Sequence, residues 1–179
     1  IHFGVIGAGR IGGSILRKAK AIGFNCYFYD PYQDSGYEKM LGVNRIETQD
    51  ELLKIADIIS INTPLTNITR GMIDESFISS MKTGASFINA ARGEIVSDID
   101  IFTVPIKSGK LSSIALDVLP QEPPDSSTLI NSWKNNEEWI SGRVIINPHT
   151  SYFSDKAYFE MRTSAAMNAK NIIEGKIPK

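Results

Sequence analysis

The sequence predicts an α/β fold, a doubly wound and mostly parallel sheet with helices on both faces. Three observations predict it. Short apolar runs alternate with segments of helical periodicity along most of the 179 residues, and such alternation requires crossover connections between parallel strands. A glycine-rich turn at residues 7–12 joins the first apolar run to the first helical segment. Several later apolar runs end directly in polar residues, as strands do at the ligand-binding edge of a parallel sheet.

The first half of the chain alternates strands with helices. The segment after the glycine turn repeats apolar residues at spacings of three and four and stops at Gly23, which is typical of a helix and its C-terminal glycine. Thr48 and Glu51 have the spacing of a capping box, and Asp74 precedes a short helix as its cap. The predicted strands are 1–6, 24–29, 42–46 and 57–62, and the predicted helices are 10–22, 48–56 and 74–81.

The second half continues the pattern with strands at 85–90, 112–117 and 143–147 and helices at 98–108 and 154–174. Pro105 lies inside the first of these helices, so we expect a kink or an early end there. Residues 119–142 are too long for a plain connection and either contain short helices or serve a function. Trp133 and Trp139 in this stretch fit either a packed local cluster or an interface or cleft lid.

The composition excludes several classes of protein. Lys and Arg number 19 and Asp and Glu number 20, so the net charge of −1 provides no basic field for nucleic acid. No apolar run approaches the roughly 18–20 residues of a membrane span. The single cysteine, Cys26, cannot form an internal disulfide and suits a cytoplasmic protein. The chain opens inside a predicted strand without a Met, so we expect further residues upstream.

The turn at residues 7–12 has the pattern G-x-G-x-x-G between a strand and a helix. Gly7 permits the tight turn, Gly9 lets the backbone approach a pyrophosphate, and Gly12 lets the helix pack close to the strand. The helix N-terminus then offers free N–H groups to the phosphates. The turn therefore predicts a dinucleotide site of the Rossmann type.

Asp30 supports this interpretation, because it ends the second strand 18 residues after Gly12. An acidic side chain there accepts hydrogen bonds from the ribose hydroxyls and repels a 2′-phosphate. The sequence therefore predicts NAD in preference to NADP. The alternative is that Asp30 is only a turn residue before Pro31.

Polar residues follow the later strands where each one ends, and parallel strands bring such residues to one cleft. Arg92 is suited to grip a substrate carboxylate through two hydrogen bonds, and His149 to donate a proton to a carbonyl oxygen. Glu122 would keep the imidazole protonated and oriented. The alternatives are a surface arginine, a structural histidine and an exposed loop acid. The residues in question are Thr63, Pro64, Arg92, Asp117, Glu122 and His149.

Six motifs resemble, in the same order, the NAD-binding domain of the D-isomer-specific 2-hydroxyacid dehydrogenases. The resemblance is closest to the branch that contains the C-terminal-binding-protein corepressors, and phosphoglycerate dehydrogenases are close cousins. The motifs are Gly-Ala-Gly-Arg-Ile-Gly, Tyr-Asp-Pro-Tyr, Thr-Pro-Leu-Thr, Asn-Ala-Ala-Arg-Gly-Glu, Ala-Leu-Asp-Val-Leu-Pro-Gln-Glu-Pro and Asn-Pro-His.

The resemblance implies a role for each matched residue. Arg92 would bind the substrate carboxylate, His149 would be the acid and base, and Glu122 would pair with His149. Asp117 would hold the nicotinamide carboxamide. The implied cofactor-binding residues are Gly7, Gly9, Arg10, Ile11, Gly12, Asp30, Pro31, Thr63, Pro64, Ala90, Ala91 and Asp117, and no metal site is expected.

The resemblance also implies a domain organisation. Residues 1–175 would form the dinucleotide-binding domain, and residues 176–179 would begin the return to a substrate domain absent from this chain. A homodimer and a small 2-keto or 2-hydroxy acid substrate are expected. Two alternatives remain open: an NAD(H)-sensing, corepressor-like module that binds protein partners, and another Rossmann protein such as a methyltransferase or flavin protein.

Overall fold

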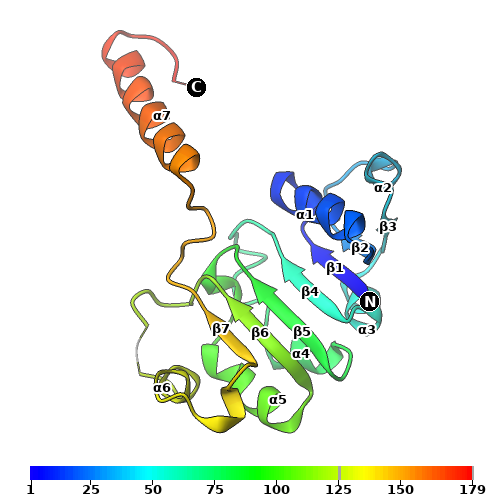
Figure 1. The fold of residues 1–179 in the computed structure, drawn as a ribbon. Coiled ribbons are helices and arrows are strands. Elements are labelled where there is room, and N and C mark those ends of the chain that lie inside the picture. The colour runs from blue at the N-terminus through cyan, green and yellow to red at the C-terminus, as the bar shows by residue number, and fades with distance from the viewer. Residues whose placement is uncertain (125, 179) are drawn as a thin grey trace. The chain divides into compact units, whose positions relative to one another are not determined.

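The computed structural model describes residues 1–124 and 126–178. The chain divides into two compact units, Ile1–Pro148 and His149–Lys179. The first unit contains the whole sheet, and the second is built around one long helix (Figure 1). The predicted domain boundary at residue 175 stays a prediction.

The first unit is built on a sheet of seven parallel strands in the order β3-β2-β1-β4-β5-β6-β7. The chain winds outward in one direction from β1 to β3, then returns and winds in the other direction from β4. This confirms the doubly wound parallel fold, with its switch point between β1 and β4. The strands are β1 (His2–Ile6), β2 (Asn25–Tyr29), β3 (Asn44–Arg45), β4 (Ile58–Ile61), β5 (Ala85–Asn89), β6 (Leu111–Leu116) and β7 (Val144–Ile146).

Three helices begin at the predicted starts, each with a side chain that caps it. The side chains of Thr48, Asp74 and Ser154 each accept a hydrogen bond from the backbone N–H three residues on, at 3.3, 2.8 and 3.1 Å. The α-helices are α1 (Arg10–Ala21), α2 (Tyr37–Leu41), α3 (Gln49–Ile55), α4 (Glu75–Ser80), α5 (Thr103–Ser108), α6 (Thr128–Lys134) and α7 (Asp155–Ile173). Three short 3₁₀ turns are η1 (Gly93–Ile95), η2 (Ile99–Phe102) and η3 (Glu138–Ile140).

Two hydrophobic clusters lie on the two faces of the sheet. Phe3 and Val5 alternate along β1 with Gly4 and Ile6, and the alternation sends them to opposite faces. Phe3 and Val5 pack with α1 and α2 in the smaller cluster. Ile6 belongs to the larger cluster, which includes residues of α3, α4, α5 and α6. Helices therefore pack against both faces of the sheet at β1.

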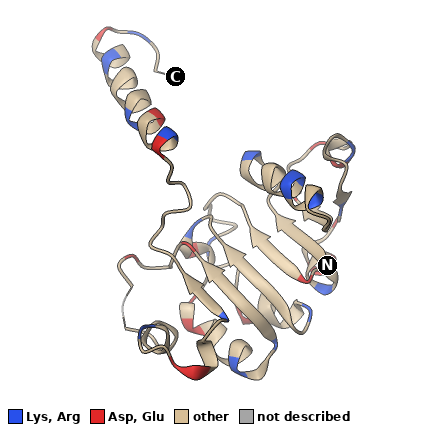
Figure 2. Cartoon of the chain, in the orientation of Figure 1, with Lys and Arg blue, Asp and Glu red and all other residues tan. Residues whose placement is uncertain are grey.

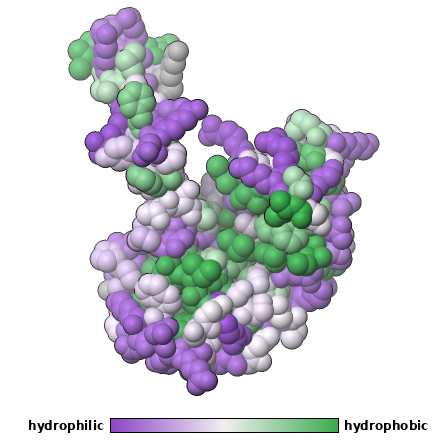
Figure 3. Space-filling view, viewed as in Figure 1, coloured by the Kyte–Doolittle hydropathy of each residue, from purple (hydrophilic) through white to green (hydrophobic). Residues whose placement is uncertain are grey.

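The face covered by α1 and α2 continues beyond them over β5 to β7. Ser86, Ile88 and Ala115 are only half-buried there, and Ile145 is 58 % exposed. Hydrophobic side chains accordingly reach the molecular surface of this unit (Figure 3), while the charged residues lie mainly on helices and loops (Figure 2). Burial of β5 to β7 therefore comes mainly from the larger hydrophobic cluster on the opposite face of the sheet.

One predicted helix is wrong in its extent. The structure divides residues 98–108 into η2 and α5, with α5 beginning at Thr103. Pro105 is thus the third residue of α5, where the missing N–H would have had no partner within the helix. The helix accommodates Pro105 by starting just before it and continues to Ser108, so the predicted kink or early end at Pro105 is wrong.

The stretch 119–142 does contain short helical elements, α6 and η3. Trp139 packs against the larger hydrophobic cluster, and the Nζ atom of Lys107 lies 4.5 Å from its ring centroid. Its indole N–H donates a hydrogen bond of 2.6 Å to Glu137. Trp139 therefore belongs to a packed local cluster, whereas Trp133 is 38 % exposed.

The second unit consists of a turn followed by α7. No residue of α7 is buried, and Phe159, Met167 and Ile173 are among its exposed apolar side chains. The guanidinium carbon of Arg162 lies 4.1 Å from the ring centroid of Tyr158. Across residues 1–124 and 126–178, no helix is both long enough and apolar enough to cross a membrane.

Candidate functional site

The glycine turn places three glycines in three different environments. Gly7 has a φ of +89°, and a Cβ on it would lie 2.8 Å from backbone atoms of Asn62. A Cβ on Gly12 would lie 2.0 Å from the carbonyl oxygen of Gly7, so α1 can pack this close only with glycine there. A Cβ on Gly9 would meet no atom within 4 Å. The turn is therefore tight at both ends and open at Gly9, as a backbone that must approach a ligand requires.

A cavity of about 600 Å³ lies at the switch point of the sheet, where doubly wound α/β proteins bind their ligands. Most of its lining residues lie at the ends of β1, β2 and β4 or in the segments that follow them. Six of the predicted cofactor-binding residues line it, namely Gly7, Gly9, Asp30, Pro31, Thr63 and Pro64. The remaining lining residues, which the sequence did not identify, are Ile6, Tyr29, Tyr32, Gln49, Asn62, Thr66, Ile68, Thr69 and Met72.

Asp30 is held in a defined orientation at the end of β2. Only 8 % of the residue is exposed, and its Oδ2 accepts a hydrogen bond of 2.8 Å from the N–H of Ala8 in the glycine turn. Its Oδ1 accepts one of 2.9 Å from the N–H of Tyr32. Because a carboxylate oxygen can accept more than one hydrogen bond, Asp30 retains acceptor capacity toward the cavity. If Asp30 served only as a turn residue before Pro31, it would not need this hydrogen bond to the glycine turn.

The segment after β4 forms another wall of the cavity. The Oγ1 atom of Thr63 is buried and has no hydrogen-bond partner among the described residues. Farther along, the hydroxyls of Thr66 and Thr69 lie 3.2 Å apart, and Thr69 donates a hydrogen bond of 2.6 Å to the carbonyl oxygen of Pro64. These bonds fix the loop that carries Ile68, which is 76 % exposed.

The cavity fits a dinucleotide on four observations: the open backbone at Gly9, the oriented carboxylate of Asp30, the unpaired hydroxyl of Thr63, and an apolar lining. Tyr29, Pro31, Tyr32, Ile68 and Met72 supply that apolar lining, which suits a planar base.

Arg92 follows β5 at the same edge of the sheet. Its side chain is exposed, and one Nη atom donates a hydrogen bond of 2.6 Å to the carbonyl oxygen of Ala91. The buried Asn89 fixes this loop: its Oδ1 accepts from the N–H of Ala91 and its Nδ2 donates to the carbonyl oxygen of Arg92, both at 3.0 Å. Ala90 is exposed beside it.

Asp117 and Glu122 belong to the loop that follows β6. Asp117 is 5 % exposed, and its N–H donates to the carbonyl oxygen of Asn89 at 2.9 Å. The Oε1 atom of Glu122 accepts a hydrogen bond of 2.9 Å from the N–H of Leu119. A Cβ built on Gly93 would lie 1.8 Å from the carbonyl oxygen of Leu119. The loops that carry Arg92 and Glu122 are therefore in direct backbone contact.

His149 is the first residue of the second unit and has a φ of +54°. The chain reaches it from the carboxyl end of β7, where the N–H of Asn147 donates to the carbonyl oxygen of Leu116. The first unit thus brings together the loops of Arg92 and Glu122 but does not include His149. The predicted meeting of the guanidinium, the carboxylate and the imidazole stays a prediction.

The remaining predicted residues lie around the glycine turn. Arg10 and Ile11 are the first residues of α1 and are exposed, with Ile11 at 68 %. Neither lines the cavity, and Gly12 is buried behind it. Among the described residues, no three His, Cys, Asp or Glu side chains gather in a way that could hold a metal ion.

Comparison with known proteins agrees with this geometry. Residues 2–151 match the family described as D-isomer specific 2-hydroxyacid dehydrogenase, NAD binding domain. D-3-phosphoglycerate dehydrogenase from Methanocaldococcus jannaschii is 34 % identical over 174 residues, which cover 97 % of this chain and 31 % of that protein. The corresponding enzyme from Bacillus subtilis is 37 % identical over 128 residues, covering 72 % and 24 %.

Solved structures of the same family superpose closely. D-lactate dehydrogenase from Aquifex aeolicus, solved with NAD and lactic acid, gives a TM-score of 0.84 at 31 % identity and covers 98 % of this chain and 54 % of that one. The holo form of D-mandelate dehydrogenase from Rhodotorula graminis gives 0.81 at 31 % identity, covering 95 % and 47 %. The chain thus spans about half the length of these structures and a third or less of the curated relatives.

The family match extends over most of the chain and includes the glycine turn, Asp30, Arg92 and Glu122. The fold, the cavity at its switch point and the relatives all agree. This chain belongs to the D-isomer specific 2-hydroxyacid dehydrogenase family and is its NAD-binding domain.

Proposed function

We propose that the protein carrying this chain interconverts a D-2-hydroxy acid and its 2-keto acid with NAD(H). The observation that carries the proposal is the direct contact between the Arg92 and Glu122 loops, at the sheet edge that also holds the cavity. Relatives named for D-3-phosphoglycerate, D-lactate and D-mandelate support the substrate class. When bound, NADH supplies the hydride that the C2 atom of the keto acid receives.

The residues around the cavity would hold the cofactor. The backbone of Gly7, Gly9, Arg10, Ile11 and Gly12 would approach the pyrophosphate at the N-terminus of α1. Asp30 would accept hydrogen bonds from the ribose hydroxyls and repel a 2′-phosphate, which favours NAD over NADP. The other contacts along the dinucleotide would come from Pro31, Thr63, Pro64, Ala90, Ala91 and Asp117, the last of which would bind the nicotinamide carboxamide.

Arg92 would grip the carboxylate of the substrate. Its guanidinium is planar and can make two parallel hydrogen bonds, which fixes the orientation of the acid as well as its position. The hydrogen bonds from Asn89 hold the backbone from which this side chain extends. Binding the carboxylate in one orientation places C2 in one direction, as a stereospecific reaction requires.

His149 would handle the proton of the reaction. In reduction its protonated imidazole gives a proton to the carbonyl oxygen, and in oxidation the neutral imidazole takes the proton of the hydroxyl group. Glu122 would orient the ring and favour its protonated form. His149 comes shortly after Ile146, the last residue of β7. The chain therefore leaves the sheet at its carboxyl edge, as this role requires.

The proposal is tested on the full-length protein with NADH and a panel of 2-keto acids. We expect turnover of at least one keto acid. Arg92→Gln should lower kcat/KM by about a hundredfold, since losing one partner of a charged hydrogen-bonded pair costs about 3 kcal/mol. Arg17→Gln, on an exposed position of α1, is the matched control and should change nothing.

Two outcomes would separate the proposal from its alternatives. Tight NADH binding without turnover of any keto acid would overturn the enzymatic function and favour an NAD(H)-sensing module that binds protein partners. Absence of NADH binding at high micromolar concentration would overturn the cofactor assignment within the proposed site. The family resemblance also predicts a homodimer, which sedimentation equilibrium measures.

A further inference from the structure

We propose that Gly93, together with Asn89, is a positioning residue that fixes the distance between the Arg92 loop and the Glu122 loop. The inference deepens the proposed function and rests on it, because Arg92 and Glu122 have their roles only there. It concerns residues that touch neither the cavity nor the reacting groups. Its physical basis is a backbone-to-backbone contact that no residue other than glycine permits.

Gly93 begins η1 directly after Arg92 and is buried. A Cβ at this position would lie 1.8 Å from the carbonyl oxygen and 2.0 Å from the carbonyl carbon of Leu119, and 2.7 Å from the nitrogen of Pro120. All three atoms belong to the backbone, so no rotamer change relieves the overlap. The φ of Gly93 is not in the left-handed region. Glycine is therefore required here for close approach and not for its backbone conformation.

The contact passes directly to Glu122. The N–H of Leu119 donates its hydrogen bond of 2.9 Å to the Oε1 atom of Glu122. Leu119 thus touches Gly93 through its carbonyl group and holds the Glu122 carboxylate through its amide. A displacement of Leu119 away from Gly93 would carry the carboxylate of Glu122 with it.

The other side of the contact is fixed by Asn89, which is fully buried at the end of β5. Its side chain bonds to the backbone of Ala91 and Arg92, and its own carbonyl oxygen accepts the N–H of Asp117. A buried amide with these bonds gives the loop little freedom to yield. Asn89 therefore fixes Arg92 to the sheet, and Gly93 sets how closely the next loop approaches it.

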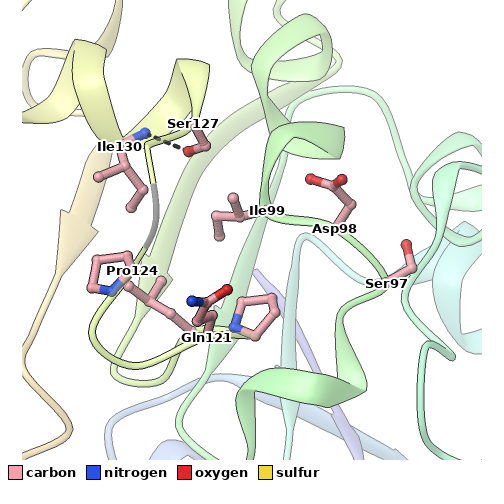
Figure 4. Close-up of a pocket in the computed structure, with 9 residues that line it drawn as sticks. Ser97, Asp98, Ile99, Gln121, Pro124, Ser127 and Ile130 are labelled. Carbon is pink, nitrogen blue, oxygen red and sulfur yellow. Dashed lines mark hydrogen bonds between the residues drawn. The ribbon is translucent and has the colours of Figure 1, made fainter.

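Open space adjoins the Leu119 side of the contact. Leu119 and Pro120 line a pocket of about 240 Å³, to which Gly93 does not contribute. Figure 4 shows Gln121 and Pro124 on one side of this pocket, with Ser97 and Asp98 across from them. A larger residue at position 93 can therefore displace the Leu119 turn toward this pocket, at the cost of part of the packing of Leu119 in the larger hydrophobic cluster. We expect Gly93→Ala to fold with the two loops more than 1 Å farther apart.

The test compares Gly93→Ala with Gly84→Ala in the full-length protein. Gly84 has a φ of +79° and open space around its Cβ position, so alanine there strains the backbone without separating any loops. For Gly93→Ala we expect kcat/KM for the keto acid to fall about a hundredfold, because a 1 Å misplacement costs that much. The Kd of NADH should stay within about threefold. Gly84→Ala should leave both values unchanged.

A second readout is independent of catalysis. Hydrogen exchange at the amide of Leu119 reports its bond to Glu122, and we expect it to be about tenfold faster in Gly93→Ala than in Gly84→Ala or the unmodified protein. If the protein binds NADH but turns over no keto acid, the proposed function fails while the exchange measurement still tests the contact. Unchanged exchange at Leu119 together with unchanged kcat/KM would overturn the role of Gly93.

Asn89→Ala provides a further variant should Gly93→Ala fail to fold. It leaves the Gly93 contact sterically possible but releases the backbone of Ala91 and Arg92. We expect lower kcat/KM, with a pH–rate profile displaced to lower pH, the direction expected when the charge of Glu122 no longer acts on the imidazole. A merely structural role would lower the stability of the protein and leave the pH–rate profile where it is.

Discussion

Asp30 lies where a single side chain would select the cofactor in the proposed function. Its two oxygens already accept the N–H groups of Ala8 and Tyr32, at 2.8 and 2.9 Å. These bonds orient the carboxylate at the cavity behind the glycine turn, and its oxygens keep spare acceptor capacity. The same residue therefore shapes the turn and, in the proposed function, selects the ligand, so we expect a substitution to have two separable effects.

We expect Asp30→Asn to weaken NADH binding by about tenfold, since a neutral acceptor makes a weaker hydrogen bond than a carboxylate. The preference for NADH over NADPH should fall as well, because the repulsion of a 2′-phosphate is lost. Fluorescence titration with both nucleotides measures this. Asp34→Asn removes the same charge from an exposed position four residues on and should leave the preference intact. An Asp30→Asn protein that still rejects NADPH would contradict the assignment.

Glu122 offers a second prediction at this scale. Glu122→Gln keeps an oxygen that can accept the N–H of Leu119 but removes the charge that favours a protonated imidazole. We expect the pH–rate profile for keto acid reduction to move to lower pH, with the loop fold preserved. Glu160→Gln, on the exposed surface of α7, is the charge control. An unmoved profile for Glu122→Gln would remove Glu122 from its proposed pairing with His149.

At the scale of elements, an ion pair joins three segments at the amino edge of the sheet. The Nζ atom of Lys82, before β5, lies 2.5 Å from the Oδ1 of Asp57, before β4, and the N–H of His2 in β1 donates to Oδ2 at 2.8 Å. The hydrogen bond from Lys82, followed by that from His2, holds the pKa of Asp57 below its usual value. These bonds stabilise the folded state only while Asp57 is ionised.

This lowered pKa predicts a dependence of stability on pH. The stabilisation is fully present above the unfolded pKa of about 3.9 and is lost as pH falls through the lower, folded value. The two side chains are 49 % and 34 % exposed, so we expect less than about 1 kcal/mol. In urea unfolding, Asp57→Asn should be less stable than the unmodified protein at pH 7, with the difference shrinking toward pH 3. A difference of the same size at both pH values would contradict the pKa shift.

Much of the fold was predictable at the scale of elements, because each strand and helix carries its own local signal. Alternating apolar runs marked the strands, and Thr48, Asp74 and Ser154 marked helix starts that the structure confirms. Residues 42–46 were predicted as a strand, but only Asn44 and Arg45 pair with β2. Gly42 ends α2 with a φ of +65°, and a helix of five residues has too little periodicity to be recognised.

Most of the site was less accessible to sequence reasoning. The glycine turn and Asp30 could be predicted because their spacing reflects one continuous βαβ unit. Gly93 and Asn89 could not, since their importance depends on Leu119 and Asp117, which the fold brings beside them from a later segment. The one available signal was a polar asparagine at the end of an apolar run, and its side-chain partners are visible only in three dimensions.

At the scale of the whole molecule, the division into two units assigns the cavity and the residue proposed to transfer the proton to different units. Both hydrophobic clusters and every residue that lines the 600 Å³ cavity belong to Ile1–Pro148. His149, the proposed acid and base, belongs to the second unit. The first unit therefore contains both hydrophobic clusters and the whole cavity lining but lacks the group proposed to move the proton.

A truncation after Pro148 tests this separation. We expect residues 1–148 to fold cooperatively and to bind NADH with a Kd within about threefold of that of the 179-residue chain, because the cavity and its supporting core remain intact. Calorimetric titration measures the affinity, and thermal unfolding checks the fold. The matched variant is His149→Ala in the full-length protein, which should keep NADH binding and lose keto acid reduction. Folded residues 1–148 that bind NADH more than tenfold more weakly would show that the second unit contributes to the cofactor site, and the cavity would then be only part of that site.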